Sequence, residues 1–206
     1  MIVAPVNRRR EMKTKESWEA VVNNYEKSQR VRAEHIPIYG FPIVTVQVFK
    51  ILVPLLLGKK VIDVCSGAAY LAAKLKSVGV DCTAMDNFST KYAMMDGAHC
   101  FERFAHCDVV KADAATQDLS RYDVVIMSWP DYDEPFAATI AGNMRVNQQL
   151  LYQGEGWGGC TGDETFHKTL SEKFMEDEEL SDRLDAAHIR FDGIYDNWRF
   201  YTKWKR

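Results

Sequence analysis

Short β-branched apolar runs alternate with helix-like segments over most of the chain, from Lys59 to about residue 187. The runs predict five strands, at 61–65, 81–85, 107–111, 122–127 and 149–153. The spacing of apolar residues between and after the runs predicts helices at 68–77, 89–104, 134–146, 164–175 and 178–187, with only a short connection after 107–111. Strands that alternate with helices are typical of a parallel sheet with right-handed crossovers and helices on both faces. We therefore expect an α/β fold.

The two ends of the chain depart from this alternation. Residues 1–13 read as a basic arm, and apolar spacing predicts a helix over 14–35 that the sequence I36-P-I-Y-G-F-P42 breaks. A second helix is expected over 43–57. Two aromatic runs, 188–195 and 197–204, predict an antiparallel hairpin at the C-terminus. The expected organisation is an arm with a helical extension over 1–57, followed by an α/β domain over 58–206.

Charge and cysteine content exclude some classes of function. The net charge of −3 argues against a strongly basic nucleic-acid binder, although the basic arm leaves a local patch open. The five cysteines form no CxxC pair and the histidines lack ligand spacing, so neither a metal site nor a disulfide framework is predicted. A reducing cytoplasm is the expected setting.

The longest apolar stretch, 41–57, is a poor candidate for a membrane span. Gln47, Lys50 and two prolines interrupt it. The start of the chain also lacks the pattern of a signal peptide. No membrane partner is expected.

Candidate chemistry begins where the first strand ends. The run through Asp63 turns at Cys65, Ser66 and Gly67 into an Ala/Leu/Lys-rich helix. In open α/β sheets this edge binds ligands, because turn amides and the helix dipole face it. The plainer alternative is a strand-to-helix turn that binds nothing.

The second strand ends in Asp86 and Asn87, about twenty residues beyond the glycine turn, a spacing at which nucleotide-binding sheets place a ribose-binding carboxylate. A carboxylate there can accept both hydrogen bonds of a ribose diol. The alternative is an acidic N-cap for the next helix, and the two roles are compatible.

The element order, the terminal hairpin and these acidic residues resemble class I S-adenosylmethionine-dependent methyltransferases over about residues 59–206. The resemblance implies a Rossmann-like, seven-stranded, mostly parallel sheet with a C-terminal antiparallel hairpin, an N-terminal helical extension and S-adenosylmethionine as cofactor. In that family, glycines follow the first acidic residue at alternate positions. Here the matching positions are Cys65, Gly67 and Ala69, so two of the glycines are replaced by small residues.

The resemblance also assigns residues beside the adenine and over the cofactor. K111-A-D-A-A115 is similar to the family's acidic motif, so Asp113 would accept from the exocyclic amine and the Ala114 N–H would donate to a ring nitrogen. The segment before the first strand often covers the cofactor, and here it offers Tyr39 and Phe41. The implied cofactor-binding residues are Tyr39, Asp63, Cys65, Ser66, Gly67, Asp86, Asn87, Asp113 and Ala114.

The fourth strand ends in S128-W-P-D-Y132. This resembles the motif of family members that methylate amino groups of DNA bases or glutamine, in which Asp, Asn or Ser precedes two prolines and an aromatic residue. Ser128 and Pro130 match, Trp129 and Asp131 depart, and Tyr132 comes one position late. All five are candidate catalytic residues. Asp131 is alternatively a general base or a ligand for a cationic substrate, and the plainest interpretation is a proline turn.

A glycine-rich loop, 154–162, follows the fifth strand and contains Glu155 and Trp157 as candidate substrate contacts. So many glycines favour either close backbone approach to a substrate or a lid. Its last residues also resemble a helix-capping signal.

Together these patterns predict a methyltransferase that modifies nitrogen on a small molecule or a nucleic-acid base. The alternative is a non-catalytic binding module that keeps the fold and acts through a protein or nucleic-acid partner. A nicotinamide-dependent reductase is disfavoured, because the first turn lacks the G-x-G-x-x-G pattern.

Overall fold

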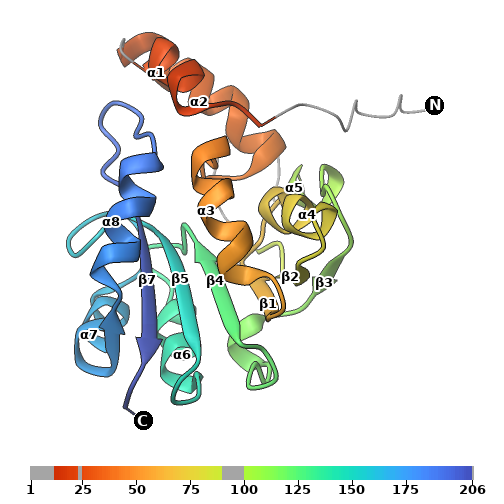
Figure 1. The fold of residues 1–206 in the computed structure, drawn as a ribbon, viewed down its shortest axis with the longest axis vertical. Helices are drawn as coiled ribbons and strands as arrows, with labels where there is room; N and C mark the ends of the chain where they lie inside the picture. The colour runs from red at the N-terminus through yellow and green to blue at the C-terminus, as the bar shows by residue number, and fades with distance from the viewer. Residues whose placement is uncertain (1–11, 23–24, 90–99, 206) are drawn as a thin grey trace.

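The computed structural model describes residues 12–22, 25–89 and 100–205, and within them one sheet of seven strands in the order β3-β2-β1-β4-β5-β7-β6 (Figure 1). The strands are β1 (Lys60–Val64), β2 (Asp81–Asp86), β3 (Val109–Lys111), β4 (Val124–Ser128), β5 (Gln149–Gly154), β6 (Phe174–Glu176) and β7 (Asn197–Lys203). The helices are α1 (Lys15–Val22), α2 (Tyr25–Tyr39), α3 (Val46–Leu56), α4 (Tyr70–Ser77), α5 (Cys100–Arg103), α6 (Phe136–Asn143), α7 (Glu164–Lys173) and α8 (Glu178–Ala187), with a 3₁₀ turn η1 (Ala114–Thr116).

The pairing of the strands confirms the expected fold class. β1 to β5 run parallel, whereas β7 is antiparallel to both β5 and β6. β1 pairs with β2 on one side and with β4 on the other, so the strand order reverses between β1 and β4. Such a reversal opens a crevice at the carboxyl ends of the strands, which is where open α/β sheets bind ligands.

The antiparallel strand pair is not the hairpin expected over 188–204. Only its second half forms a strand, and the outer partner of β7 is β6, which follows α7 directly. The helix expected over 164–175 therefore ends at Lys173. Residues 188–196 form no strand because their apolar side chains pack elsewhere: Phe191 is buried against Trp18 and Val22 of α1.

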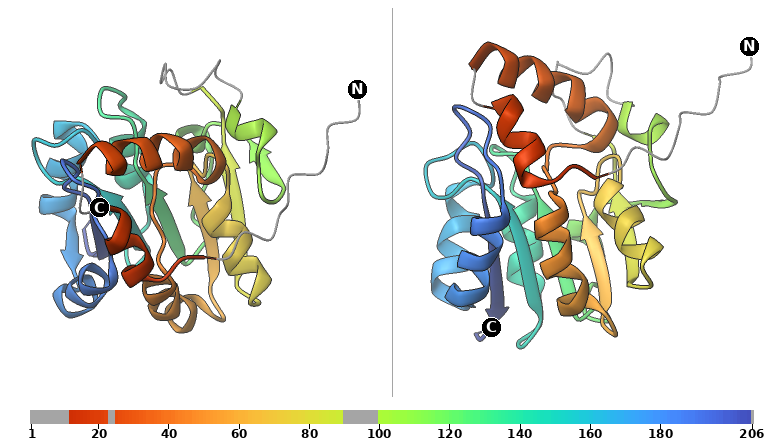
Figure 2. Two further views of the ribbon diagram at one scale, coloured as in Figure 1. Left: turned by 90° about the horizontal axis from the view of Figure 1, so that it is seen from above. Right: turned by 45° about the horizontal axis from the view of Figure 1, so that its top comes forward.

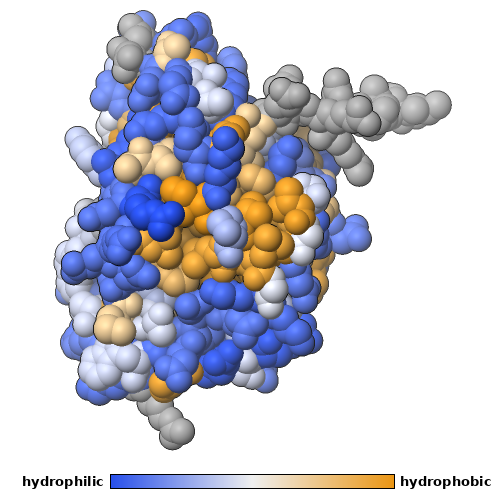
Figure 3. Space-filling view, viewed as in Figure 1, coloured by the Kyte–Doolittle hydropathy of each residue, from blue (hydrophilic) through white to orange (hydrophobic). Residues whose placement is uncertain are grey.

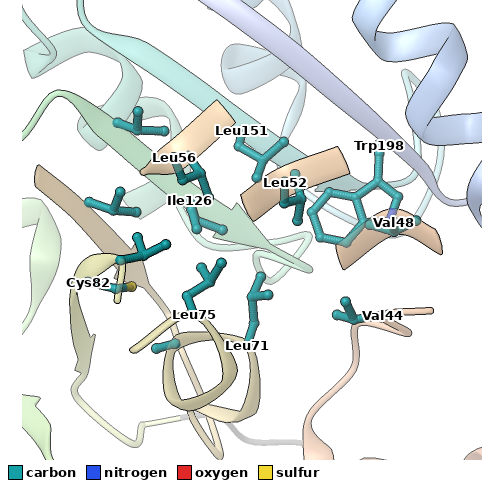
Figure 4. Packing of buried hydrophobic residues seen from close by; sticks show 14 of the residues in the cluster. Val44, Val48, Leu52, Leu56, Leu71, Leu75, Cys82, Ile126, Leu151 and Trp198 are labelled. Atoms are coloured by element: carbon teal, nitrogen blue, oxygen red, sulfur yellow. The ribbon is translucent and has the colours of Figure 1, made fainter. Parts of the chain in front are cut away.

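Apolar side chains cover both faces of the sheet. Neighbouring strand residues alternate between faces: Val124 and Ile126 join the cluster under α3, α4 and α8, whereas Val125 and Met127 join the cluster under α6 and α7. Figure 4 shows the first cluster, where Leu52 and Leu56 of α3 and Trp198 of β7 meet over the central strands. This two-sided burial fixes the strand ends that form the site.

Two helices of the N-terminal extension, α1 and α2, lie at the end of the sheet toward which the parallel strands point, whereas α3 packs on one face of the sheet (Figures 1 and 2). The extension is fastened to α8 and the segment after it: Thr45 Oγ1 donates to the Ala187 carbonyl at 2.9 Å, and Gln29 Nε2 donates to the Asp192 carbonyl at 2.9 Å. The break expected from residue 36 comes later, because α2 continues through Pro37 to Tyr39. The chain then turns at Gly40, whose φ is +88°.

Two expected features fall largely or partly outside the described residues. These are the basic arm over 1–13 and most of the helix over 89–104, of which α5 is the described part.

Partly exposed apolar residues gather on the outer surface of α3 (Figure 3). Among the described residues, no helix combines the length and the apolar content that crossing a bilayer requires.

Candidate functional site

A cavity of about 360 Å³ opens at the carboxyl edge of the sheet, at the reversal between β1 and β4. Its wall includes the turns after β1 and β2, the start of η1, the end of β4 and the connection between α2 and α3. All nine residues expected to bind the cofactor line it: Tyr39, Asp63, Cys65, Ser66, Gly67, Asp86, Asn87, Asp113 and Ala114.

The turn between β1 and α4 is left-handed at three alternate positions. Cys65, Gly67 and Ala69 have φ values of +55°, +51° and +52°. These are the positions at which the sequence resemblance implies glycine, and a left-handed backbone favours glycine at each of them. A Cβ on Gly67 would lie 3.5 Å from the Phe101 ring, an ordinary contact. Cys65 and Ala69 hold this backbone at a cost of order 1 kcal/mol each.

Asp86 ties this turn to the end of β2. Its Oδ2 accepts a hydrogen bond from the Gly67 N–H at 2.8 Å, and its Oδ1 accepts one from the Phe88 N–H at 2.6 Å. Burial raises the pKa of Asp86 even though both backbone hydrogen bonds oppose the shift. The carboxylate is thereby fixed at the cavity wall, with one lone pair of each oxygen still able to accept from a ligand.

Asp63 is a second acid in the same wall, and only 3 % of its surface is exposed. Burial, together with the charge of Asp86, raises its pKa to about 8. Two acids whose ionisation is suppressed in one cavity favour a ligand that brings positive charge, since a cation stabilises the ionised form of each.

The other cofactor candidates are held by local hydrogen bonds and ring contacts. Asp113 caps η1, accepting from the Ala115 N–H at 2.9 Å, and Asn87 Oδ1 accepts from the Ser89 N–H at 3.0 Å. Tyr39 stacks on His35, with 4.6 Å between ring centroids. Phe41, the other expected cover residue, also lines the cavity.

The end of β4 contributes Ser128, Trp129 and Asp131 to the cavity but not Pro130 or Tyr132. Tyr132 is 57 % exposed, and the Pro130 carbonyl accepts from the Gly162 N–H at 3.0 Å. Ser128 is buried, and its Oγ has no hydrogen-bond partner among the described residues.

Trp129 has a φ of +51°, a conformation that bulky residues rarely adopt. Its ring stacks on Phe41 with 5.7 Å between centroids, and the Arg32 guanidinium carbon lies 4.8 Å from the ring centroid. Its backbone N–H donates to the Gln153 carbonyl at 2.7 Å. These contacts fix an aromatic side chain in the cavity wall.

No sequence pattern pointed to the buried carboxylate that orients Trp129. Asp196 Oδ2 accepts from Trp129 Nε1 at 3.2 Å and from Gln153 Nε2 at 2.5 Å, while its Oδ1 lies 3.1 Å from His188 Nε2. Burial would raise the pKa of Asp196, but hydrogen bonds to these side chains and the nearby His188 lower it overall. A single Asp between Tyr195 and Asn197 offers no pattern that reveals this cluster.

Glu155 and Trp157 of the glycine-rich loop do not line the cavity. Glu155 Oε2 accepts from the Cys160 N–H at 2.8 Å, and its Oε1 accepts from the Tyr195 N–H at 2.9 Å. Trp157 is 62 % exposed and lies beside His167, with 6.1 Å between ring centroids. The geometry gives Glu155 a role in holding the loop together.

Internal packing accounts for three of the loop glycines. An added Cβ would lie 2.5 Å from the Tyr152 hydroxyl at Gly154, 2.4 Å from the Glu155 Cβ at Gly159 and 2.5 Å from the Phe166 ring at Gly162. The capping signal at the end of the loop belongs to Asp163, whose Oδ1 accepts from the Phe166 N–H at 2.7 Å.

The described lining of the cavity is acidic. It contains five acidic residues and none of the basic residue types Lys, Arg and His. The five are Asp63, Asp86, Asp113, Asp131 and Glu134. The His, Cys, Asp and Glu side chains of the described residues form no group of three that could hold a metal ion. An organic cation therefore fits this lining better than a metal or a phosphate does.

Neither a protein-family model nor a curated protein matches the chain. Among solved structures, the PH0226 protein from Pyrococcus horikoshii is 13 % identical with a TM-score of 0.51, and the match covers 92 % of this chain and 99 % of that one. Magnesium protoporphyrin IX methyltransferase from Synechocystis, solved with bound S-adenosylmethionine, is 15 % identical with a TM-score of 0.47. That match covers 91 % of this chain and 90 % of that one. A TehB-like S-adenosylmethionine-dependent methyltransferase from Corynebacterium glutamicum is 16 % identical with a TM-score of 0.46. That match covers 87 % of this chain and 100 % of that one.

These likenesses concern the fold alone. The match to the Pyrococcus horikoshii protein spans nearly the whole of both chains, and it agrees with the seven-stranded mixed sheet described above. The chain has a Rossmann-like α/β fold with a seven-stranded, mostly parallel sheet.

Proposed function

We propose that the protein is an S-adenosylmethionine-dependent methyltransferase that transfers the methyl group to a nitrogen of a small molecule or a nucleic-acid base. The observation that carries this proposal is a convergence. Nine residues chosen from the sequence for their match to cofactor-binding motifs, in segments far apart along the chain, line a single cavity. That cavity lies at the strand reversal, where this class of sheet binds its ligands.

The charge of the cavity supports this cofactor over phosphate-bearing nucleotides. S-adenosylmethionine brings a sulfonium and an ammonium group, whereas nicotinamide nucleotides and ATP bring phosphates. The described lining offers five acidic residues and no basic side chain to meet a phosphate. Ser66 also carries a buried hydroxyl oxygen without a partner among the described residues, and a polar ligand would satisfy it.

Each side chain has a definite role in the proposed site. Asp63 would hold the ammonium group of the cofactor, Asp86 the ribose hydroxyls, and Asp113 with the Ala114 N–H the adenine. The bound cofactor supplies an electrophilic methyl carbon. Ser128, Trp129 and Asp131 would position the acceptor nitrogen in line with it, which is the main contribution that a protein makes to such a displacement.

The thiols support the expected cellular setting. All four cysteines on which the structure reports, Cys65, Cys82, Cys107 and Cys160, are free. Free thiols are typical of a reducing compartment, so we propose a cytoplasmic enzyme.

Calorimetric titration with S-adenosylmethionine and S-adenosylhomocysteine tests the proposal, with an Asp86→Asn variant. Loss of the charged acceptor should weaken binding by roughly 10- to 100-fold, the usual range for a hydrogen bond to a charged group. Asp81→Asn is the matched control: Asp81 is exposed at the other end of the same strand and does not line the cavity. Its affinity should equal that of the wild type.

Two results would count against the proposal. One is a folded wild-type protein that binds neither compound, and the other is equal affinity of the Asp86→Asn and Asp81→Asn variants. Cofactor binding without methyl transfer to any acceptor pool would instead favour the non-catalytic binding module.

A further inference from the structure

The residues that line the cavity come from the two sides of the strand reversal. The turns after β1 and β2 and the start of η1 supply the proposed cofactor site. The end of β4 and the segment leading into α6 supply a second group that this site does not use: Ser128, Trp129, Asp131, Glu134 and Phe136. This second group of lining residues is therefore available to bind the methyl acceptor.

We propose that the acceptor is a small-molecule amine, bound as its ammonium form by the carboxylates of Asp131 and Glu134 and by the Ser128 hydroxyl. This inference rests on the proposed function and narrows it, because it names the acceptor class and rejects a nucleic-acid base.

Ser128 is the observation that points to a ligand independently of the acids. Only 8 % of its surface is exposed, its Oγ has no hydrogen-bond partner among the described residues, and it lines the cavity. A buried hydroxyl is nearly always paired, so this one lacks a partner that a bound molecule would supply. An amine nitrogen suits it, since a hydroxyl accepts from N–H groups.

The sign of the charge selects among acceptors. Asp131 and Glu134 lie in one lining with Asp86 and Asp113, so a carboxylate or a phosphodiester would be repelled and an ammonium attracted. A nucleic-acid base would have to bring its phosphates to this edge, against a net charge of −3 on the whole chain. Arg32 lies close by, 4.8 Å from the Trp129 ring centroid, but it is not part of the lining.

The aromatic residues suit the body of such an amine. Phe41, Trp129 and Phe136 line the cavity, and Phe41 and Trp129 are stacked at an interplanar angle of 19°. Aromatic faces hold both apolar groups and cations. A cavity of about 360 Å³ is also at the small end of ligand sites, so the acceptor must be small beside a cofactor of nucleoside size.

The chemistry balances with these groups. The ammonium loses a proton to the carboxylate of Asp131 or Glu134, which frees the nitrogen lone pair. The nitrogen then forms a bond to the methyl carbon while the carbon–sulfur bond breaks and its electron pair stays on sulfur. The product is a methylated ammonium and a neutral thioether, and the carboxylic acid returns its proton to solvent.

Transfer of a radiolabelled methyl group by the full chain tests the inference. The probes are benzylamine and 2-phenylethylamine, their alcohol analogues, benzoate and a mixed-sequence single-stranded DNA oligonucleotide. We expect label in the amines at a rate at least about tenfold above every other probe, the discrimination that one hydrogen-bonded charge gives.

Variants connect this preference to the named side chains. Asp131→Asn and Glu134→Gln should each lower kcat/KM for the amine by about tenfold with unchanged affinity for S-adenosylmethionine. Asp133→Asn is the matched control, because Asp133 lies between them in sequence, is exposed and does not line the cavity.

The outcomes separate this inference from the proposed function. Cofactor binding that depends on Asp86, together with no preference for the amines or with variants that match Asp133→Asn, overturns the inference alone. Label in the oligonucleotide and not in the amines also overturns it. Failure to bind S-adenosylmethionine at all removes the proposed function, and this inference with it.

Discussion

Asp63 retains a proton at pH values where an exposed aspartate is ionised. Burial, with the charge of Asp86, raises its pKa to about 8, whereas in the unfolded chain the carboxyl ionises near its ordinary value of 3.8. Between those pH values unfolding releases a proton, so rising pH favours the unfolded state. The contribution of Asp63 to stability therefore falls as pH rises through this window and levels off above about pH 8.

An Asp63→Asn variant should remove this dependence. The free energy of unfolding of the wild type, measured with urea from pH 6 to pH 9, should fall relative to that of the variant by about 1.4 kcal/mol per pH unit up to pH 8. Asp81→Asn, which changes an exposed carboxyl, should follow the wild type. Parallel curves for the wild type and Asp63→Asn would show that Asp63 is ionised in the folded protein.

At the scale of single residues, sequence motifs pointed to residues that line the cavity but not to the residues that hold this lining in place. Asp63, Gly67 and Asp86 follow apolar runs, so their place at the strand ends can be read along the chain. Asp196 acts on Trp129 from 67 positions away, through contacts that only the folded chain makes. The left-handed φ of Trp129 is equally hidden, since nothing in its residue type favours it.

At the scale of elements, the central strands β1 and β4 were predictable because they are largely buried and rich in apolar β-branched residues. β3, at the edge of the sheet, is short and mostly exposed, and its place follows from the alternation of strands and helices along the chain. The outer strand pair was not predictable. Phe174 to Glu176 continue the pattern of α7 without a breaker, and their pairing with β7 depends on residues that come after another helix. The aromatic run at 188–195 is apolar because Phe191 packs on the N-terminal helices. A strand and an irregular buried segment share this composition.

The glycine-rich loop gives a test of whether its glycines serve packing. An alanine at Gly159 would place its Cβ 2.4 Å from the Glu155 Cβ, whereas at Gly156 nothing lies within 4 Å. Overpacking of this kind costs about 1–3 kcal/mol, and a change at an open surface position stays within about 0.5 kcal/mol. Urea unfolding of Gly159→Ala and Gly156→Ala should therefore separate the two variants.

The same pair of variants also tests the lid interpretation of the loop. If these glycines instead serve loop closure over a substrate, both variants would keep the stability of the wild type. Their turnover would differ from that of the wild type. Equal unfolding free energies for Gly159→Ala and Gly156→Ala would thus contradict the packing explanation.

At the scale of the whole molecule, a chain of ring contacts joins the C-terminal segment to the cavity through the N-terminal extension. Phe191 contacts Trp18, Trp18 contacts His35, and His35 stacks on Tyr39, which lines the cavity. The centroid distances along this chain are 5.6, 5.4 and 4.6 Å. The extension is therefore part of the cavity wall, and whatever loosens it should also affect the site.

Protonation of His35 is one such change. Burial lowers its pKa to about 4, against an ordinary value of 6.5, and its Nε2 has no partner among the described residues. As pH falls from 6.5 to 4, His35 binds a proton in the unfolded chain but not in the folded protein. The free energy of unfolding therefore decreases on acidification. The loss should be about 1.4 kcal/mol per pH unit within that window. His35→Phe, which keeps a stacking ring and cannot titrate, should not show this loss.

Amide hydrogen exchange distinguishes opening of the extension from general destabilisation. Wild type and His35→Phe are compared at pH 4.5 and at pH 7, so the chemical exchange rate cancels at each pH. Opening driven by His35 predicts faster exchange in α1 and α2 of the wild type at pH 4.5 only, with the amides of β1 and β4 unchanged. Acceleration spread evenly over helices and sheet would mean that protonation of His35 acts on global unfolding. Equal exchange in both proteins would mean that protonation of His35 does not affect opening of the extension.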